Sequence, residues 1–141
     1  MLLGQYEHSL DSKQRLILPS KIKNEFSAEV YVTLDFDGCL SLYSEANYNE
    51  RAKAIQSLSD FEKDNRLVKR VFFSNSQVLR IDAQSRILIP SFLLDKVHIS
   101  KDVMIVGMND HLEIWDKETF LQKEEESESN YSETAQRIMG C

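Results

Sequence analysis

The sequence predicts an α+β fold made of one short unit that occurs twice, with the two copies related by a pseudo-two-fold axis. Three observations support this prediction. One short segment recurs in the second half of the chain, and the apolar residues around it follow the same order in both halves. The length of 141 residues is also enough for two small units that share one core.

The recurring segment has the same residue types at the same positions in both copies. Each copy begins with an aspartate, has an arginine four residues later, continues with three aliphatic residues and ends with proline and serine. The two segments are Asp11, Arg15, Leu16-Ile17-Leu18, Pro19 and Ser20, and Asp82, Arg86, Ile87-Leu88-Ile89, Pro90 and Ser91. Farther along, residues 31–34 match residues 103–106, and residues 40–43 match residues 112–115. The similarity therefore covers a whole unit and not only a turn.

The first elements of the unit are two strands joined by a tight turn. Residues 5–10 are predicted to form the first strand. Asp11 opens the turn, because its side chain can accept hydrogen bonds from backbone amides two or three residues farther on. The strand resumes over residues 15–18 and ends at Pro19, since proline has no N–H to donate to a neighbouring strand.

A short helix and a hairpin complete the unit. Ser20 is predicted to be the N-cap of a helix over residues 21–26. A strand follows over residues 30–35, then the Asp37-Gly38 turn signal, and then an alternately apolar strand over residues 40–43. The second copy is expected to repeat these elements, with Asn109-Asp110 at the hairpin turn.

Helices are predicted between the copies and after the second one. The first begins near Ala46 and carries an apolar stripe at helical spacing, formed by Ala52, Ile55, Leu58 and Phe61. The second covers residues 60–73 and turns its apolar residues inward, namely Leu67, Val68 and Val71. A third helix begins over residues 117–126, and the polar, acidic tail from Ser127 is expected to be loosely held, with or without a final helical turn.

Each unit is too small to close its own sheet, and exposed strand edges invite pairing with another copy. The two copies are therefore expected to interlock and to bury one shared core. We divide the chain into a first repeat with its helical linker, residues 1–73, and a second repeat with the C-terminal helix and acidic tail, residues 74–141.

The distribution of charge matters more than the net charge of -6. Most of the excess acid lies in residues 116–141, whereas residues 12–23 contain Lys13, Arg15, Lys21 and Lys23 and no acid. The body of the chain is thus close to neutral, with one local basic segment. Such a distribution is compatible with a nucleic-acid partner that contacts a focused patch.

Several classes of protein find no support in the sequence. No apolar run is long enough to span a membrane, and the N-terminus lacks the features of a signal peptide, so a cytoplasmic location is expected. Cys39 and Cys141 offer no disulfide framework, and Cys39 is expected to pack as a small apolar residue. The three histidines have no ligand spacing, and there is no nucleophile elbow or phosphate-binding loop. We therefore expect no metal, no cofactor, no small-molecule substrate and no catalytic residues.

The two Asp-x-x-x-Arg loops, each followed by an aliphatic triplet and Pro-Ser in a chain of this length, resemble the MraZ family. The resemblance covers nearly the whole chain. It implies a swapped-hairpin fold of the AbrB and MazE type, in which the two units form a double-split β-barrel with flanking helices. It also implies a nucleoid-associated transcriptional regulator of the division and cell-wall gene cluster, including its own promoter. The family further implies a ring-shaped homo-oligomer that binds repeats in double-stranded DNA.

The chemistry of the loops is consistent with DNA contact. An arginine at the end of a tight turn presents a planar set of donors that can bind a phosphate or the O6/N7 edge of guanine, so Arg15 and Arg86 are predicted to contact DNA directly. Asp11 and Asp82 would either fix the turn or orient the arginine through an ion pair. The lysines of the basic segment are assigned to the DNA backbone, namely Lys13, Lys21 and Lys23.

The second copy departs from the first at three positions. Gln84 replaces the lysine at the loop tip, so the second loop either binds more weakly or reads an adenine edge. Phe92 and Leu94 replace the two lysines of the helix, where they could instead line a subunit interface.

Two simpler interpretations stand beside DNA contact. Each Asp-x-x-x-Arg pair could be only a local salt bridge that holds a hairpin. The whole chain could also be a non-catalytic oligomeric scaffold or protein-interaction module, antitoxin-like, that recruits a protein through its acidic tail or central helices and binds no DNA. The recurrence of the pair at equivalent positions beside a basic segment favours the DNA-binding hypothesis.

Overall fold

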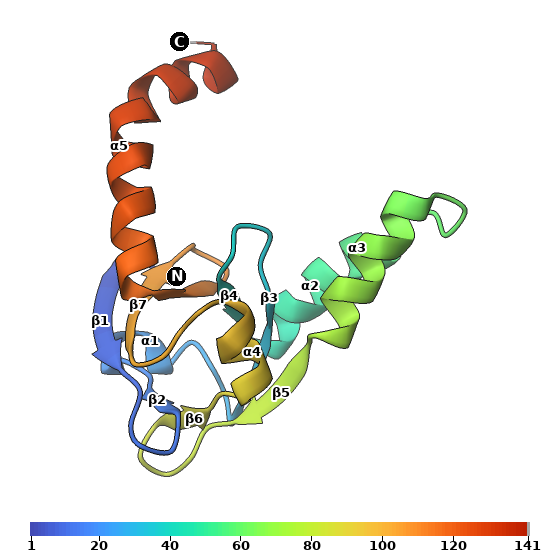
Figure 1. Ribbon diagram of the computed structural model, residues 1–141. Coiled ribbons are helices and arrows are strands. Elements are labelled where there is room, and N and C mark those ends of the chain that lie inside the picture. The colour runs from blue at the N-terminus through green and yellow to red at the C-terminus, as the bar shows by residue number, and fades with distance from the viewer. Residues whose placement is uncertain (141) are drawn as a thin grey trace.

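The computed structural model describes residues 1–140, in which eight strands and five helices follow the repeat of the sequence (Figure 1). The first copy contains β1 (Gln5–Ser9), β2 (Arg15–Ile17), α1 (Ser20–Lys23), β3 (Glu29–Leu34) and β4 (Leu40–Tyr43). The second copy contains β5 (Gln77–Arg80), β6 (Arg86–Leu88), α4 (Ser91–Lys96), β7 (Asp102–Gly107) and β8 (Leu112–Asp116). The remaining helices connect the copies or follow the second one, namely α2 (Glu45–Gln56), α3 (Lys63–Ser74) and α5 (Lys117–Met139).

The strands form a six-stranded antiparallel sheet in the order β1-β7-β8-β4-β3-β5 and a separate antiparallel pair, β2-β6. If each strand is exchanged for its equivalent in the other copy, the order of the large sheet is only reversed, which is the signature of a pseudo-two-fold axis. The first strand of each copy pairs with the third strand of the other, β1 with β7 and β5 with β3. The two copies therefore interlock, as expected.

One hydrophobic core contains side chains from both copies. The outer residues of both aliphatic triplets are among its most deeply buried members, with Leu16, Leu18, Ile87 and Ile89 at most 1% exposed. Each fully buried aliphatic side chain contributes about 1.5–3 kcal/mol to folding. Burial of these four side chains in the core thus fixes the paired strands β2 and β6 on the body.

A smaller apolar cluster attaches the start of α5 to the sheet. It consists of Cys39, Met104, Trp115 and Phe120. Cys39 is fully buried, which confirms its expected packing as a small apolar residue, and Cys141 lies outside the described residues. Tyr43 and Trp115, at equivalent strand ends, are both buried in the chain.

The N-cap predicted at Ser20 is wrong. Ser20 is the first residue of α1, its side chain makes no capping hydrogen bond, and Pro19 occupies the N-cap position. The fixed φ of proline is compatible with helix initiation, and the Pro19 carbonyl accepts from the N–H groups of Ile22 and Lys23. The α-helix also ends at Lys23, before the predicted residue 26.

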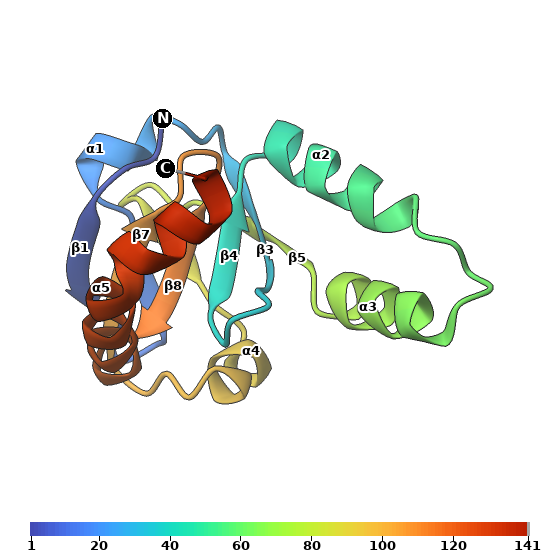
Figure 2. The same cartoon turned by 90° about the horizontal axis from the view of Figure 1, so that it is seen from above.

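The apolar stripe predicted for the linker is only partly buried. Ile55 of α2 and Phe72 of α3 face the body, but Leu67 and Val71 are exposed and Phe61 is 95% exposed. These side chains are exposed because α2 and α3 project from the body as an arm (Figure 2). Phe61 lies in the loop that joins the outer ends of the two helices. A helical stripe is buried only where another element covers it, and the body covers only the inner part of the arm.

The C-terminal tail is helical, which corrects the expectation of a loosely held segment. α5 continues to Met139, and the left-handed Gly140 caps it by donating its N–H to the Gln136 carbonyl at 2.9 Å. At its start, the Asp116 side chain accepts from the Thr119 N–H at 3.1 Å. Only Phe120 of this helix is buried, and the rest rises away from the body (Figure 1). None of the described helices has both the length and the apolar character needed to cross a membrane.

Neighbouring residues of β6 provide a direct test of the shared core. Ile87→Ala is expected to lower the free energy of unfolding by about 2–5 kcal/mol, because it leaves a cavity among fully buried side chains. Leu88→Ala, on the exposed face of the same strand, is the matched control and should change it by less than about 1 kcal/mol. Urea denaturation measures both values, and equal losses would contradict the burial pattern of β6.

Candidate nucleic-acid interface

The turn between β1 and β2 is held by the side chain of Asp11. Its Oδ1 accepts hydrogen bonds from the backbone N–H groups of Lys13 and Arg15, each at 2.9 Å. The backbone closes the same turn, because the Asp11 N–H donates to the Arg15 carbonyl and the Gln14 N–H donates to the Asp11 carbonyl, each at 3.0 Å. Gln14 adopts a left-handed φ of 62° to complete it.

The turn between β5 and β6 repeats this geometry atom by atom. Asp82 Oδ1 accepts from the N–H groups of Gln84 at 2.9 Å and Arg86 at 2.8 Å. The Asp82 N–H donates to the Arg86 carbonyl at 2.9 Å, and Ser85 takes the left-handed φ of 65°. The two loops of the sequence repeat are therefore structural equivalents.

The second oxygen of each aspartate binds the arginine. Arg15 Nε donates to Asp11 Oδ2 at 2.8 Å, and Arg86 Nε donates to Asp82 Oδ2 at 2.9 Å. Each carboxylate thus fixes its turn and orients its arginine at the same time, so both roles considered from the sequence are present. Within the described residues, the terminal nitrogens of the two guanidinium groups donate no hydrogen bond to protein. These donors are available to a ligand.

The same contacts keep the two aspartates ionised. The backbone N–H of Arg15 is the main cause that lowers the pKa of the Asp11 carboxyl, and the Arg15 side chain acts in the same direction against partial burial. The backbone N–H of Arg86 lowers the pKa of Asp82 in the same way. A carboxylate that accepts several N–H bonds is stabilised in its charged form.

Pairing of β2 with β6 places the two loops side by side. Arg15 lies opposite Leu88, and Ile17 lies opposite Arg86. Two further bonds link each strand to the other loop, from the Leu18 N–H to the Ser85 carbonyl at 2.9 Å and from the Ile89 N–H to the Gln14 carbonyl at 3.3 Å. Arg86 Nη1 also approaches Asp11 Oδ2 at 3.8 Å, so the two ion pairs are adjacent. Figure 1 places both loops at the end of the body opposite to α5.

The arginines stand on the outward face of the β2-β6 pair. Side chains alternate along a strand, so Leu16 and Ile87 point into the core while Arg15 and Arg86 point out. The arginine side chains are 28% and 22% exposed, because the ion pairs hold them close to the turns. The structure therefore brings the two predicted arginines together on one accessible surface, which we call the ribbon face.

Two residues of the ribbon face were missed by the sequence interpretation. Ile17 and Leu88 belong to the aliphatic triplets, which were interpreted as wholly apolar strand, yet the middle residue of each triplet is exposed. The signal that could have found them is the two-residue period of a strand, because it places each one on the same face as its arginine.

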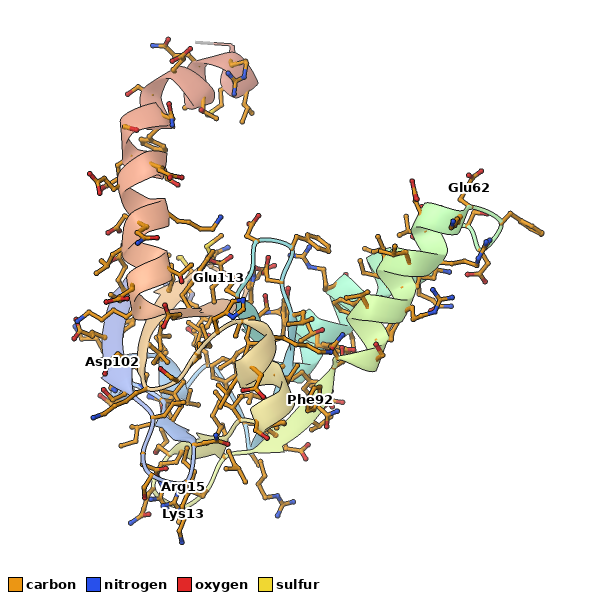
Figure 3. All side chains as sticks on the ribbon, viewed as in Figure 1. Lys13, Arg15, Glu62, Phe92, Asp102 and Glu113 are labelled. Atoms are coloured by element: carbon orange, nitrogen blue, oxygen red, sulfur yellow. The ribbon has the colours of Figure 1, made fainter. Side chains whose placement is uncertain are left out.

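The remaining predicted residues lie in the two loops and on the helices that follow β2 and β6. Lys13 and Gln84 are exposed at equivalent positions in the two loops, and Figure 3 labels Lys13 beside Arg15. Lys21 and Lys23 are exposed on α1, the helix that follows β2 in the chain, and not at the loop tips. Their counterparts in α4 differ from one another. Phe92 is 41% exposed, whereas Leu94 is buried in the core and is excluded from lining an interface.

The fold and the two loops define a class of protein in which a tandem α+β repeat presents paired Asp-x-x-x-Arg turns. Comparison with known proteins agrees with this class. The family model for the MraZ protein, described as antitoxin-like, matches residues 1–71 and again residues 72–140. The chain belongs to the MraZ family.

Relatives of the chain share one name. The transcriptional regulator MraZ of Ureaplasma parvum serovar 3 is 38% identical over 141 residues, which cover 99% of this chain and 97% of the relative. The protein of the same name from Finegoldia magna is 38% identical over 135 residues, covering 96% of this chain and 94% of the relative. That of Caldanaerobacter subterraneus subsp. tengcongensis is 35% identical and covers 98% and 96%.

Acid is expected to release the two turns only below the usual aspartate pKa of 3.8. Because folding lowers both pKa values, the stabilisation is fully present above pH 3.8 and is lost as the pH falls through the lowered values. NMR titration of the side-chain carboxyl carbons measures each pKa directly. In Asp11→Asn the Asp82 titration should remain low, and a pKa at or above 3.8 for either wild-type residue would contradict the turn geometry.

Proposed function

We propose that this protein is a sequence-specific, DNA-binding transcriptional regulator that contacts double-stranded DNA through its two Asp-x-x-x-Arg loops. The observation that carries the proposal is the ribbon face, where two equivalent guanidinium groups stand on one pair of strands with their terminal nitrogens available. The shared name of the relatives, transcriptional regulator, supports the same function.

A two-stranded β-ribbon fits the major groove of B-DNA, where sequence can be read from base edges. In our proposal Arg15 and Arg86 bind the O6/N7 edge of guanine with their terminal nitrogens. Asp11 and Asp82 occupy the Nε atoms and limit the directions in which the two side chains can point. This arrangement lowers the entropic cost of binding, because the arginines are already oriented before DNA arrives.

The neighbouring polar residues take supporting roles. Lys13, Lys21 and Lys23 neutralise phosphates and set the position of the protein on the duplex. Gln84 stands where the first loop has Lys13, so the second loop either binds more weakly or reads an adenine edge. The acidic middle of α5 is at the far end of the molecule from the ribbon face (Figure 1). Its charge is therefore compatible with an anionic partner at the loops.

We further infer from the resemblance to MraZ that the target is the division and cell-wall gene cluster, including the gene's own promoter, and that the protein acts in the cytoplasm at the nucleoid. The interlocked strands correspond in this proposal to a swapped-hairpin, double-split β-barrel of the AbrB type, built from residues 1–73 and 74–141. The sheet order, with each first strand in the other copy's half, supports it.

Arg15→Ala and Arg86→Ala are each expected to weaken binding to the DNA upstream of the gene by about 5- to 150-fold, which corresponds to about 1–3 kcal/mol for a specific arginine contact. Fluorescence anisotropy at several salt concentrations measures the effect, and log affinity should fall linearly with log salt. The matched control is Lys53→Ala, an exposed cation on α2 outside both the loops and the surfaces proposed for assembly, which should bind like wild type. Wild-type affinity in both loop variants, with the fold intact by circular dichroism, would overturn the proposed site.

We also propose a ring-shaped homo-oligomer, which two surfaces of the chain support. On α3, the partly exposed Leu67 and Val71 line a cavity of about 150 Å³ with Leu34 and Phe36 of the β3-β4 turn, and Lys63, Arg66 and Arg70 are exposed along the same helix. The outer half of α5 combines exposed Tyr131 and Ile138 with acidic residues, along a groove of about 580 Å³. The two surfaces have opposite charge, and the helices that carry them extend from different sides of the body (Figure 1). A head-to-tail contact between them would join successive copies and could close a ring.

Two double variants test this contact. Leu67→Asp with Val71→Asp, and Tyr131→Asp with Ile138→Asp, should each reduce the mass measured by light scattering, because an acidic residue opposes burial of either apolar face. Each variant keeps the surface that the other lacks, so a mixture of the two should form a one-to-one pair. If either variant alone keeps the wild-type mass, or if the mixture forms no pair, the head-to-tail contact is wrong.

A second candidate function is an antitoxin-like scaffold or interaction module that binds a protein and no DNA. The exposed apolar faces of α3 and α5 favour it, since large apolar patches mark interaction surfaces. The two candidates differ in one measurement. The scaffold predicts no retardation of any DNA even at low salt, whereas the regulator binds non-specific DNA under those conditions.

A further inference from the structure

Two large aliphatic side chains share the ribbon face with the arginines. Ile17 is 49% exposed and Leu88 is 58% exposed, whereas Leu16 and Ile87, their neighbours along the strands, are fully buried. The two exposed residues occupy equivalent positions, each two residues after the arginine of its own loop. The repeat thus places an exposed aliphatic side chain beside an arginine twice, at sites where the core gains nothing from it.

The register makes each arginine a neighbour of the other copy's aliphatic residue. Arg15 lies directly opposite Leu88, and Ile17 lies directly opposite Arg86. Side chains directly opposite one another in an antiparallel pair have Cβ atoms about 4.5–5.5 Å apart. The face is therefore a square of four side chains, with the arginines on one diagonal and the aliphatic residues on the other.

The spacing of the square is compatible with stacked base pairs. Its two rows are separated by two residues along the strands, which is about 7 Å at the rise of a β-strand. Base pairs in a duplex are about 3.4 Å apart, so the rows are separated by about two base steps. Each row offers one set of hydrogen-bond donors and one apolar group.

The combination of one arginine and one aliphatic side chain in each row indicates which kind of ligand it can bind. Phosphates, sugars and the edges of guanine and adenine offer polar groups to a protein, and the apolar group in the major groove is the C5 methyl of thymine. The terminal nitrogens of the two arginines beside Ile17 and Leu88 favour a partner rich in hydrogen-bond acceptors over another apolar protein surface, because burying these donors under such a surface would cost desolvation without a new partner. Nucleic acid supplies both the acceptors and the methyl group.

We infer that Ile17 and Leu88 contact thymine methyl groups next to the bases bound by Arg86 and Arg15, so that each row of the ribbon face reads a thymine together with its arginine's base. This inference rests on the proposed DNA-binding function and extends it to specificity. Since each row combines an arginine from one copy with an aliphatic residue from the other, the two copies read each short site jointly.

Substitution of deoxyuridine for thymine provides the test, because it removes only the methyl group. The probe is the duplex upstream of the gene, prepared with thymine or with deoxyuridine throughout, and the readout is anisotropy at fixed salt. Wild-type protein should bind the deoxyuridine duplex about fourfold more weakly for each methyl contacted, the effect expected for one buried methyl-sized group. Ile17→Ala and Leu88→Ala should each lose part of this discrimination, and the double variant should lose it entirely.

Val78→Ala is the matched control, since Val78 is a 51% exposed aliphatic residue of β5 that lies outside the ribbon face. It should discriminate like wild type. Equal wild-type affinity for the two duplexes, or full discrimination in the double alanine variant, overturns the inference while the loss of binding in Arg15→Ala leaves the proposed function standing. A fall in assembly mass in Ile17→Ala and Leu88→Ala would also overturn it, because a second copy would then cover these residues.

Discussion

The geometry of the whole functional surface depends on one carboxylate in each turn. Asp11 binds two backbone N–H groups with one oxygen and the guanidinium of Arg15 with the other, and Asp82 does the same for Arg86. A single short side chain therefore sets the path of the backbone and the direction of the arginine together. An asparagine could accept from the backbone but would have no charge for the guanidinium. The local salt bridge that holds each hairpin is therefore the same contact that orients the arginine toward a ligand.

The position of the turns is decided elsewhere, by the shared core. β2 and β6 have only three residues each and would not be stable as an isolated hairpin-like pair. Their inward residues are fully buried in a cluster to which both copies contribute. The core thus fixes the two strands, the strands fix the register of Arg15 against Leu88, and the register places the loops next to one another. The acidic, exposed helix α5 and the arm of α2 and α3 lie away from this surface and are free to serve assembly (Figures 1 and 2).

The turns and the strands that follow them could be predicted from the sequence because they depend on local chemistry. The Asp11 turn, the strand after Arg15 and their second copies depend on residues within a few positions of one another, and the structure has them where they were expected. Burial of helical residues was harder to predict. A stripe at 3.6-residue spacing indicates which side chains share a face but not whether anything covers it, so Leu67 and Val71 were expected to face inward and are exposed. The register of β2 against β6 was also out of reach, because it is fixed by contacts between the two copies.

The interlocked strand pairing affects how the protein folds during synthesis. β1, near the N-terminus, finds its partner in β7, which begins only at Asp102, and β3 pairs with β5 across the whole linker. When the N-terminal half leaves the ribosome, β1 and β3 still lack these partner strands. The sheet can form completely only after most of the remaining chain has been synthesised. Such long-range pairings make folding slow relative to helical proteins of similar size, and they leave the apolar residues of β3 accessible meanwhile. Nascent chains of this design would be natural clients of chaperones that shield unpaired strands during synthesis.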